Sequence, residues 1–181
     1  VRHVQDVAAN LRFGGHATLR VLSSANTALE LVPRTLARVM QRFPHAQISF
    51  EALPTREIVK LLVAEEADLA ISSAPLDHPV LDVREFGQWR LWCALPPGHA
   101  LLAAKRFDLT AALRGRLVLY SPEAPQSRVI DGWLEERNIH RRRGVEVRSG
   151  YAACAMAAHG AGVAFVDDLS ARAFRPERLA L

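Results

Sequence analysis

The feature that most constrains the fold is a strand–turn–helix pattern that occurs twice in the first 75 residues. In its first copy, an apolar strand at 19–23 is followed by a polar turn at 24–26 and by an amphipathic helix that ends near residue 43. Apolar residues of this helix recur at steps of three and four, and charged residues fall on its opposite face. Ser24, Asn26 and Thr27 are all suitable N-caps. Pro33 has no amide proton, which predicts a kink or an early tight turn at that point.

The second copy follows directly and is completed by a third strand. Alternating apolar and polar residues at 47–51 predict a strand, and Thr55 is the expected N-cap of the helix after it. A short buried strand is predicted at 68–73. The order strand–helix–strand–helix–strand predicts parallel strands that are joined by right-handed crossovers.

The second half of the chain continues as α/β, after a change of topology. Residues 81–86 and 89–95 read as two strands with no helix between them, which indicates passage into a second lobe. Further strands are expected at 116–120, 145–147 and 163–166. Helices are expected at 109–113, 127–138 and 151–159, with Ser127 as a candidate N-cap and with Gly160 and Gly162 ending the last one.

Composition and charge narrow the classes of protein. The chain has 181 residues with a formal net charge of +4, which permits contact with nucleic acid without arguing strongly for it. The basic stretch 137–143 has no interleaved aromatic residues, so we interpret it as a solvated helix end, with phosphate contact as the alternative. No apolar run is long enough to span a membrane. The two cysteines lie in apolar segments, and a reducing cytoplasmic location is expected.

Polar residues gather wherever a predicted strand ends. Ligands of open α/β sheets bind beyond the carboxyl ends of the strands, where free N–H groups of helices can also hold an anion. Two lobes of this kind would enclose a polar cleft. The alternative is that each polar turn only connects a strand to a helix and has no ligand-binding role. The strand-end residues are Ser24, Asn26, Thr55, Ser72, Ser73, residues 121–127, Ser149, Gly150 and Asp167.

Nothing in the sequence predicts catalysis or a bound metal. The seven histidines have no metal-ligand spacing, and there is no phosphate-binding loop or nucleophile elbow. Cys154 reads as a packed thiol on an alanine-rich helix. We therefore expect no catalytic residue, no metal site and no cofactor.

The order and spacing of four segments of the chain resemble the effector-binding domain of LysR-type transcriptional regulators. The resemblance covers about residues 1–170 and is carried by LRVLSSANTALELVPRTLARVMQRFPHAQISFEALPTREIVKLLVAEEADLAIS, LWCALPPGHAL, RVIDGWLEERNI and AAHGAGVAFV. It implies an α/β fold of two Rossmann-like lobes with a hinge, as in type 2 periplasmic binding proteins. Residues 1–15 would end a linker helix, 16–85 would form lobe I, and 86–168 would form lobe II. Hinge segments would lie near 86–90 and 164–168, and 169–181 would start a return to lobe I whose remaining family part is missing.

The resemblance also implies a set of residues that contact the ligand. Family proteins usually have proline where this chain has Asp167, and a carboxylate at a cleft rim would suit a cationic group. Helix starts at Asn26 and Thr55 would suit a carboxylate. PTREIV and the Asp after VAFV resemble regulators of octopine and nopaline use, so an amino acid, an opine or another small carboxylate is expected. The residues carried over are Ser24, Asn26, Thr55, Ser73, Pro125, Gln126, Ser127, Gly150, Tyr151 and Asp167.

The partners implied are a small-molecule inducer, a second copy of the chain, and DNA. The chain would form a homodimer or homotetramer in the cytoplasm, with no membrane contact. It would bind DNA through an N-terminal winged helix-turn-helix that lies outside this sequence. The dimer contact would join the helix at 27–43 and the strand at 47–52 to the helix at 127–138 of the partner. Two alternatives remain: a free solute-binding protein, and an enzyme on the same scaffold with Asp167 as its general base.

Overall fold

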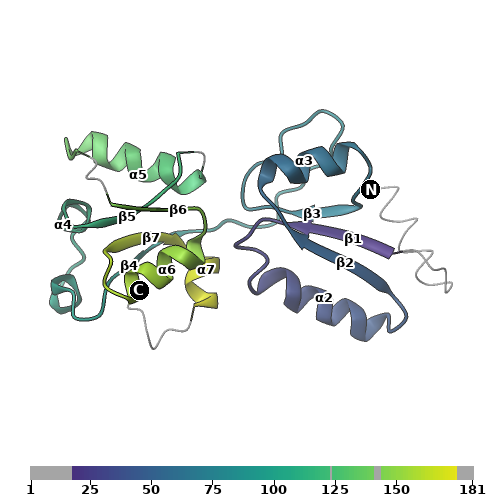
Figure 1. Cartoon of the computed structure of the whole chain (residues 1–181), viewed down its shortest axis with the longest axis horizontal. Coiled ribbons are helices and arrows are strands. Elements are labelled where there is room, and N and C mark those ends of the chain that lie inside the picture. The colour runs from purple at the N-terminus through teal and green to yellow at the C-terminus, as the bar shows by residue number, and fades with distance from the viewer. Residues whose placement is uncertain (1–17, 123, 141–143, 175–181) are drawn as a thin grey trace. The chain divides into compact units, whose positions relative to one another are not determined.

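The computed structural model describes residues 18–122, 124–140 and 144–174 (Figure 1). The chain divides into two compact units, residues 1–87 and 88–181. The predicted linker helix at 1–15 lies outside the described residues. Among the described residues, no helix is both long enough and apolar enough to cross a lipid bilayer.

The first unit is a parallel three-stranded sheet covered by two helices. Its elements are β1 (Thr18–Ser23), α2 (Leu31–Arg42), β2 (Gln47–Ala52), α3 (Thr55–Val63) and β3 (Leu69–Ile71). The strand order is β2-β1-β3, so the connection from β1 to β2 and the connection from β2 to β3 run in opposite directions along the sheet. Right-handed crossovers in opposite directions put α2 and α3 on opposite faces of the sheet, as Figure 1 shows. The predicted parallel order is confirmed.

The start of α2 differs from the prediction. The helix begins at Leu31, with Glu30 as an N-cap that makes no side-chain cap hydrogen bond, and residues 25–30 form turns. Pro33 is therefore the third helical residue. The first four amides of a helix have no partner inside it, so a missing proton costs nothing there. The prediction of a helix from residue 27 was wrong because it would have put Pro33 beyond the first turn.

The second unit contains a four-stranded sheet with one antiparallel edge. Its strands are β4 (Leu91–Ala94), β5 (Leu117–Tyr120), β6 (Val145–Val147) and β7 (Val163–Asp167). The order is β4-β7-β5-β6, and β4 alone runs antiparallel to its neighbour. The helices are a 3-10 helix (Ala100–Ala103), α4 (Leu109–Arg114), α5 (Pro125–Glu136), α6 (Gly150–Ala158) and α7 (Asp168–Ala173).

Helices cover both faces of this second sheet. In Figure 1, α5 lies on one side of the strands and α6 on the other, as expected for crossovers from β5 to β6 and from β6 to β7. Asn138 (φ 49°) follows the C-terminus of α5 and Gly160 (φ 80°) that of α6, both in the left-handed conformation that ends helices. The predicted end of α6 at Gly160 is confirmed.

The structure of residues 81–90 and the packing of the last helix bear on two predicted segments. Residues 81–90 contain no strand, so the predicted edge strand at 81–86 was wrong. Val83 and Phe86 are exposed, and this segment is an irregular chain without a strand partner among the described residues. The described part of 169–181 is α7, which packs against α6, β4 and β7 of the second unit.

Candidate functional site

Parallel pairing brings the ends of all three strands of the first unit to one edge. Ser23, the last residue of β1, lies opposite Ala52 of β2 and Ile71 of β3. The segments that start at Ser24, Leu53 and Ser72 therefore leave the sheet side by side. Two backbone hydrogen bonds fix them there, from Ser24 N to the Ile71 carbonyl at 3.0 Å and from Leu53 N to the Ser23 carbonyl at 2.9 Å.

Four polar residues at this edge form a hydrogen-bonded group, which we call the β1 cluster: Ser24, Asn26, Thr27 and Ser73. Ser24 Oγ donates to Asn26 Oδ1 at 2.8 Å and accepts from Ser73 N at 3.1 Å. Thr27 Oγ1 donates to the carbonyls of Ser24 and Ile71 at 2.9 and 3.1 Å, which holds the turn against the end of β3. Ser24, Asn26 and Thr27 are buried and Ser73 is half-buried. The structure thus brings three predicted site residues together.

Thr55 follows β2 at the same edge of the first sheet but lies outside the β1 cluster. It is the first residue of α3, is half-buried, and makes no side-chain cap hydrogen bond, because Pro54 occupies the N-cap position. The prediction of Thr55 as N-cap was therefore wrong. No hydrogen bond among the described residues joins its side chain to the β1 cluster.

A second polar group lies at the ends of β5, β6 and β7. We call Gln126, Gly150, Asp167 and Ser170 the β7 cluster. Asp167 Oδ2 accepts hydrogen bonds from Gln126 Nε2 at 3.2 Å and from Ser170 Oγ at 3.0 Å, and its Oδ1 accepts from Ser170 N at 2.8 Å. Gly150 lies so close that an added Cβ would be 2.8 Å from Asp167 Oδ2.

Asp167 does not form the rim that the sequence suggested. Its side chain is fully buried, and it is the N-cap of α7. Both carboxylate oxygens are engaged inside the second unit, which satisfies a buried charge that would otherwise be costly. The prediction of an accessible carboxylate missed that Ser170, three residues later, completes a capping pattern.

The remaining predicted residues of the second unit differ in accessibility. Ser127 is buried and its hydroxyl lies 3.0 and 2.8 Å from the carbonyls of Tyr120 and Ser121, so it ties α5 to the end of β5. It lies in the first turn of α5, whose N-cap is Ala124, so its predicted capping role was wrong. Tyr151 is 48% exposed, and its ring packs edge-on against Phe174 at 5.2 Å. Pro125 begins α5.

Burial shifts three ionisable groups of the second unit. Burial, with the nearby Asp167 carboxylate and Cys154, raises the pKa of the Tyr120 phenol far above its ordinary value. Burial also raises the pKa of Cys93 to about 12. The pKa of Cys154 is likewise about 12, through burial and the Asp167 carboxylate, against a smaller opposing backbone hydrogen bond. All three groups therefore stay protonated at neutral pH, and neither thiol is an activated nucleophile.

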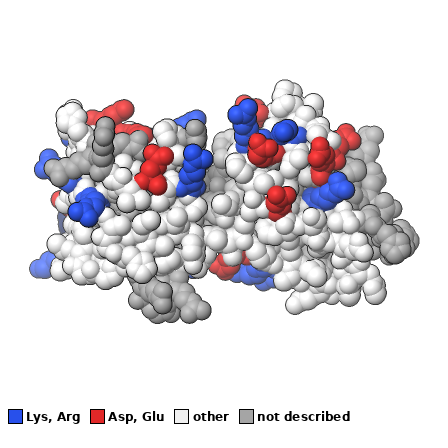
Figure 2. Space-filling view, in the orientation of Figure 1, with Lys and Arg blue, Asp and Glu red and all other residues white. Residues whose placement is uncertain are grey.

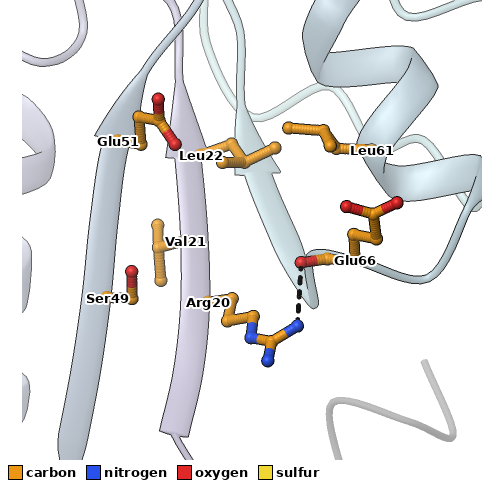
Figure 3. Close-up of a pocket in the computed structure, with 7 residues that line it drawn as sticks. All are labelled: Arg20, Val21, Leu22, Ser49, Glu51, Leu61 and Glu66. Atoms are coloured by element: carbon orange, nitrogen blue, oxygen red, sulfur yellow. Dashed lines mark hydrogen bonds between the residues drawn. The ribbon is translucent and has the colours of Figure 1, made fainter.

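Two pockets lined by described residues lie away from these clusters, each within a single unit. One, of about 200 Å³, lies on the α3 side of the first sheet (Figure 3). Arg20 crosses it and donates to the Glu66 carbonyl at 3.4 Å. The other, of about 310 Å³, is lined by Pro96, His99, Arg116, Gly160, Gly162 and Val163. Neither contains a predicted ligand-binding residue. The described residues also include no group of three or more His, Cys, Asp or Glu side chains placed to hold a metal ion.

Sequence reasoning missed two residues of these clusters as site components. Thr27 was considered only as a helix cap, although a Ser-x-Asn-Thr turn after a strand offers several side chains that can bond to one another. Ser170 was not considered. An Asp followed three residues later by a small polar residue at the start of a helix is the signal that could have identified it.

The chain is similar to known proteins in family, sequence and fold. The family described as LysR substrate binding domain matches residues 14–181. The chain is 26% identical over 171 residues to the regulatory protein NocR of Agrobacterium tumefaciens (strain T37), covering 94% of this chain and 57% of NocR. It is 23% identical over 177 residues to OccR of Rhizobium meliloti, an octopine catabolism/uptake operon regulatory protein, covering 97% of this chain and 58% of OccR. The chain thus spans somewhat more than half the length of these relatives.

The fold is shared with solved effector-binding domains. The BenM effector-binding domain with its effector benzoate superposes with a TM-score of 0.72 at 20% identity, covering 90% of this chain and 75% of that one. The predicted α/β, periplasmic-binding-protein-like fold is confirmed. The predicted resemblance to octopine and nopaline regulators is confirmed by the matches to NocR and OccR.

Proposed function

Because this chain belongs to the LysR substrate-binding domain family, we propose that it is the effector-sensing part of a DNA-binding transcription regulator. On this proposal the chain binds a small effector and catalyses no reaction. The effector favours one of two conformations of the regulator through its differential affinity for them. DNA contact would come from a winged helix-turn-helix outside this sequence, and the regulator would act in the cytoplasm.

The observation that carries the proposal is the pair of polar clusters at strand carboxyl ends. Each cluster contains a buried amide side chain, Asn26 at 9% exposure and Gln126 at 8%. Buried amides are held in place only where hydrogen bonds compensate their loss of water. We propose that each cluster offers polar groups to an effector, and that the carried-over residues around each cluster contribute. These are Ser24, Asn26, Thr55 and Ser73 in the first unit and Pro125, Gln126, Ser127, Gly150 and Tyr151 in the second.

Asp167 has a different role in this proposal from the one that the sequence suggested. Both its oxygens are already bonded to Gln126 and Ser170. A direct ion pair with a cationic ligand would require those bonds to break. We therefore propose that Asp167 holds the side chain of Gln126 in place and does not itself contact the effector.

The proposed effector class is an amino acid, an opine or another small carboxylate. OccR is named for octopine, and the solved BenM domain holds benzoate. Isothermal titration of the chain with amino acids, octopine, nopaline and plain dicarboxylates tests the class. We expect heat from at least one zwitterion. Binding of a plain dicarboxylate together with no heat from any zwitterion would exclude an amino acid or an opine and leave another small carboxylate, and heat from none of these compounds would contradict the class.

We also propose that the chain forms a homodimer, or a homotetramer built from such dimers, through α2 and β2. Met40 is 53% exposed and Phe50 is 37% exposed, although both are large and apolar. On the face that Figure 2 shows, the surface over α2 carries few charged side chains, whereas charged side chains gather over α3; α2 also has the exposed Arg34, Arg38 and Arg42. The proposed partner surface is α5 of the second copy, where Val129 is 38% exposed.

Sedimentation velocity tests the dimer. We expect the chain to sediment as a dimer, and Met40→Glu to weaken that dimer because it places a charge in an apolar contact. Glu66→Lys, which changes a charge on the side of the sheet that α3 covers, is the matched control and should leave the dimer intact. A wild-type chain that stays monomeric at high concentration would contradict this geometry.

A further inference from the structure

The second unit has a pocket at the edge of its sheet opposite to the β7 cluster. Arg116 directly precedes β5 and Gly162 directly precedes β7, and these two parallel strands begin side by side. Because β4 runs antiparallel to β7, the segment after β4, which contains His99, leaves the sheet at the same edge. Val163 and Asp167, at the two ends of β7, are roughly 13 Å apart at the usual rise of a strand. The pocket is therefore separate from the β7 cluster.

His99 has one occupied nitrogen and one unused donor. Its Nδ1 accepts from the backbone N–H of Leu101 at 3.2 Å, which caps the 3-10 helix Ala100–Ala103. A backbone N–H can only donate, so Nδ1 carries no proton and the ring has its proton on Nε2. No described residue accepts a hydrogen bond from that Nε2–H. His99 therefore offers a donor to the pocket that it lines.

Arg116 and Gly162 add further unused donors to the same pocket. Arg116 is exposed, and its guanidinium forms no ion pair or hydrogen bond with any described residue. Gly162 is buried, yet its backbone N–H donates to no described group, whereas the amides of Ala161 and Val163 on either side of it both donate to carbonyls. Buried N–H groups without a partner are rare because they cost free energy. An acceptor atom bound in the pocket would remove that cost at Gly162.

Close packing places these two residues together. Val163 N donates to the Arg116 carbonyl at 2.7 Å, and a Cβ added to Gly162 would collide with that same carbonyl oxygen. The added Cβ would also lie 3.3 Å from Arg116 Cγ. The stem of the Arg116 side chain therefore begins beside Gly162, and only glycine leaves room for this approach.

The pocket combines N–H donors with an absence of negative charge among the described residues that line it. Its volume is about 310 Å³, and the two polar side chains in its lining are those of His99 and Arg116. Such a set of donors suits an anion, and a planar guanidinium matches a pair of oxyanion oxygens in bidentate fashion. The volume is about ten times that of a water molecule in the liquid, which leaves room for a small organic group beside the anion.

We propose that this pocket is a second ligand site, which binds inorganic phosphate or a small phosphate ester. The Arg116 guanidinium binds two oxygens of the phosphate, and Gly162 N and His99 Nε2 donate to its oxygens as well. A phosphate ester has three free acceptor oxygens for donors from three separate segments, whereas a carboxylate has only two. The site includes no residue of the β1 or β7 cluster, so its failure would leave the proposed function unaffected.

NMR titration of the whole chain tests the site with three probes: inorganic phosphate, glycerol phosphate and glycerol. We expect both phosphates at millimolar concentration to shift the Gly162 N–H resonance in ¹⁵N-correlated spectra until it saturates. Glycerol should cause no shift, and the Ser170 N–H resonance in the β7 cluster should stay unchanged with every probe. Tighter binding of glycerol phosphate would identify an ester as the ligand, and equal or tighter binding of inorganic phosphate would identify the free ion. Absence of a saturable shift at Gly162 with either phosphate would overturn the inference.

Two exposed arginines provide a matched pair of variants. We expect Arg116→Gln to weaken phosphate binding roughly 10- to 100-fold, since hydrogen bonds to charged groups have this worth. Arg114→Gln removes the same charge from α4, two residues earlier, at a side chain that is exposed and does not line the pocket. It should leave the affinity nearly unchanged. Equal losses in the two variants would mean that phosphate responds only to the general positive charge, and would overturn the inference.

His99→Asp tests the second side chain independently of Arg116. The new carboxylate can still accept from Leu101 N and cap the 3-10 helix, but it replaces a donor with a negative charge. We expect at least about tenfold weaker binding of glycerol phosphate, because like charges in contact repel. An unchanged affinity in both His99→Asp and Arg116→Gln would show that the phosphate binds elsewhere and would overturn the inference.

Discussion

At the scale of single residues, Gly150 shows how little space surrounds the β7 cluster. A Cβ at this position would lie 2.2 Å from Ser170 Oγ and 2.8 Å from Asp167 Oδ2. We expect Gly150→Ala to destabilise the chain by about 1–3 kcal/mol, as overpacking of a tight interior does. Urea unfolding measures the change.

Gly132 is the matched control for Gly150. It lies inside α5, and a Cβ there would meet nothing within 4 Å. Gly132→Ala should therefore stabilise the chain by about 0.5–1 kcal/mol, because alanine loses less backbone entropy in a helix. Equal changes in the free energy of unfolding for the two substitutions would contradict the close packing of Gly150 against Ser170 and Asp167.

The two buried thiols predict that the stability of the folded chain depends on pH in the alkaline range. Their pKa values of about 12 lie above the ordinary thiol value, so between about pH 9 and 12 the unfolded chain loses these protons while the folded chain keeps them. The folded state then binds more protons, and its stability falls as pH rises through that range.

At pH 8 the folded chain has roughly a thousandfold less thiolate than the unfolded chain. We expect iodoacetamide to modify Cys93 and Cys154 far more slowly than in guanidinium, as mass spectrometry can follow. Equal rates would contradict this.

Asp167 shows why single residues are the hardest part of a site to predict. The sequence places it correctly at the end of a strand, because strand ends follow from periodicity. Whether its carboxylate faces solvent or the protein depends on Ser170 and Gln126, which approach it from α7 and α5. Those contacts come from packing, and no local pattern around Asp167 specifies them.

At the scale of helices, capping separates two residues that look alike in the sequence. Ser149 Oγ accepts from Ala152 N at 3.2 Å and caps α6, whereas Thr55 makes no cap bond at the start of α3. We expect Ser149→Ala to destabilise the chain by about 1 kcal/mol, the usual worth of an N-cap. Thr55→Ala should cost less than about 0.5 kcal/mol. Thermal or urea unfolding measures both, and a larger loss for Thr55→Ala would contradict the assigned helix starts.

Periodicity predicted which helices and strands exist better than where they begin. The strands at 116–120, 145–147 and 163–166, and the helices after the first two of them, follow from clear apolar spacing and turn residues. The first helix was placed too early because apolar spacing continues through residues 25–30, where the structure has turns. The predicted strand at 81–86 was wrong because residues 81–90 have no strand partner among the described residues.

At the scale of the whole chain, the two units have unequal cores. Among the described residues, the core of the second unit has twenty buried apolar members, whereas the cluster beneath α3 in the first unit has three, Leu22, Ile58 and Ala67. Burial of apolar surface is the main stabilising contribution to a fold. The first unit is therefore expected to open more readily than the second.

Amide hydrogen exchange tests this difference, and two substitutions make it specific. We expect amides of β1 and β3 to exchange at least about tenfold faster than those of β5 and β7, because regions with few buried contacts open at lower free energy. Ile58 and Ile130 are matched probes, one in each unit, at 0% and 2% exposure. Ile58→Val should speed exchange in the first unit alone, and Ile130→Val in the second alone, each by the equivalent of about 0.5–1.5 kcal/mol. Acceleration that spreads across both units would mean that they open as one cooperative body. In that case the smaller core beneath α3 would not set the stability of the first unit, since the twenty-residue core would support both.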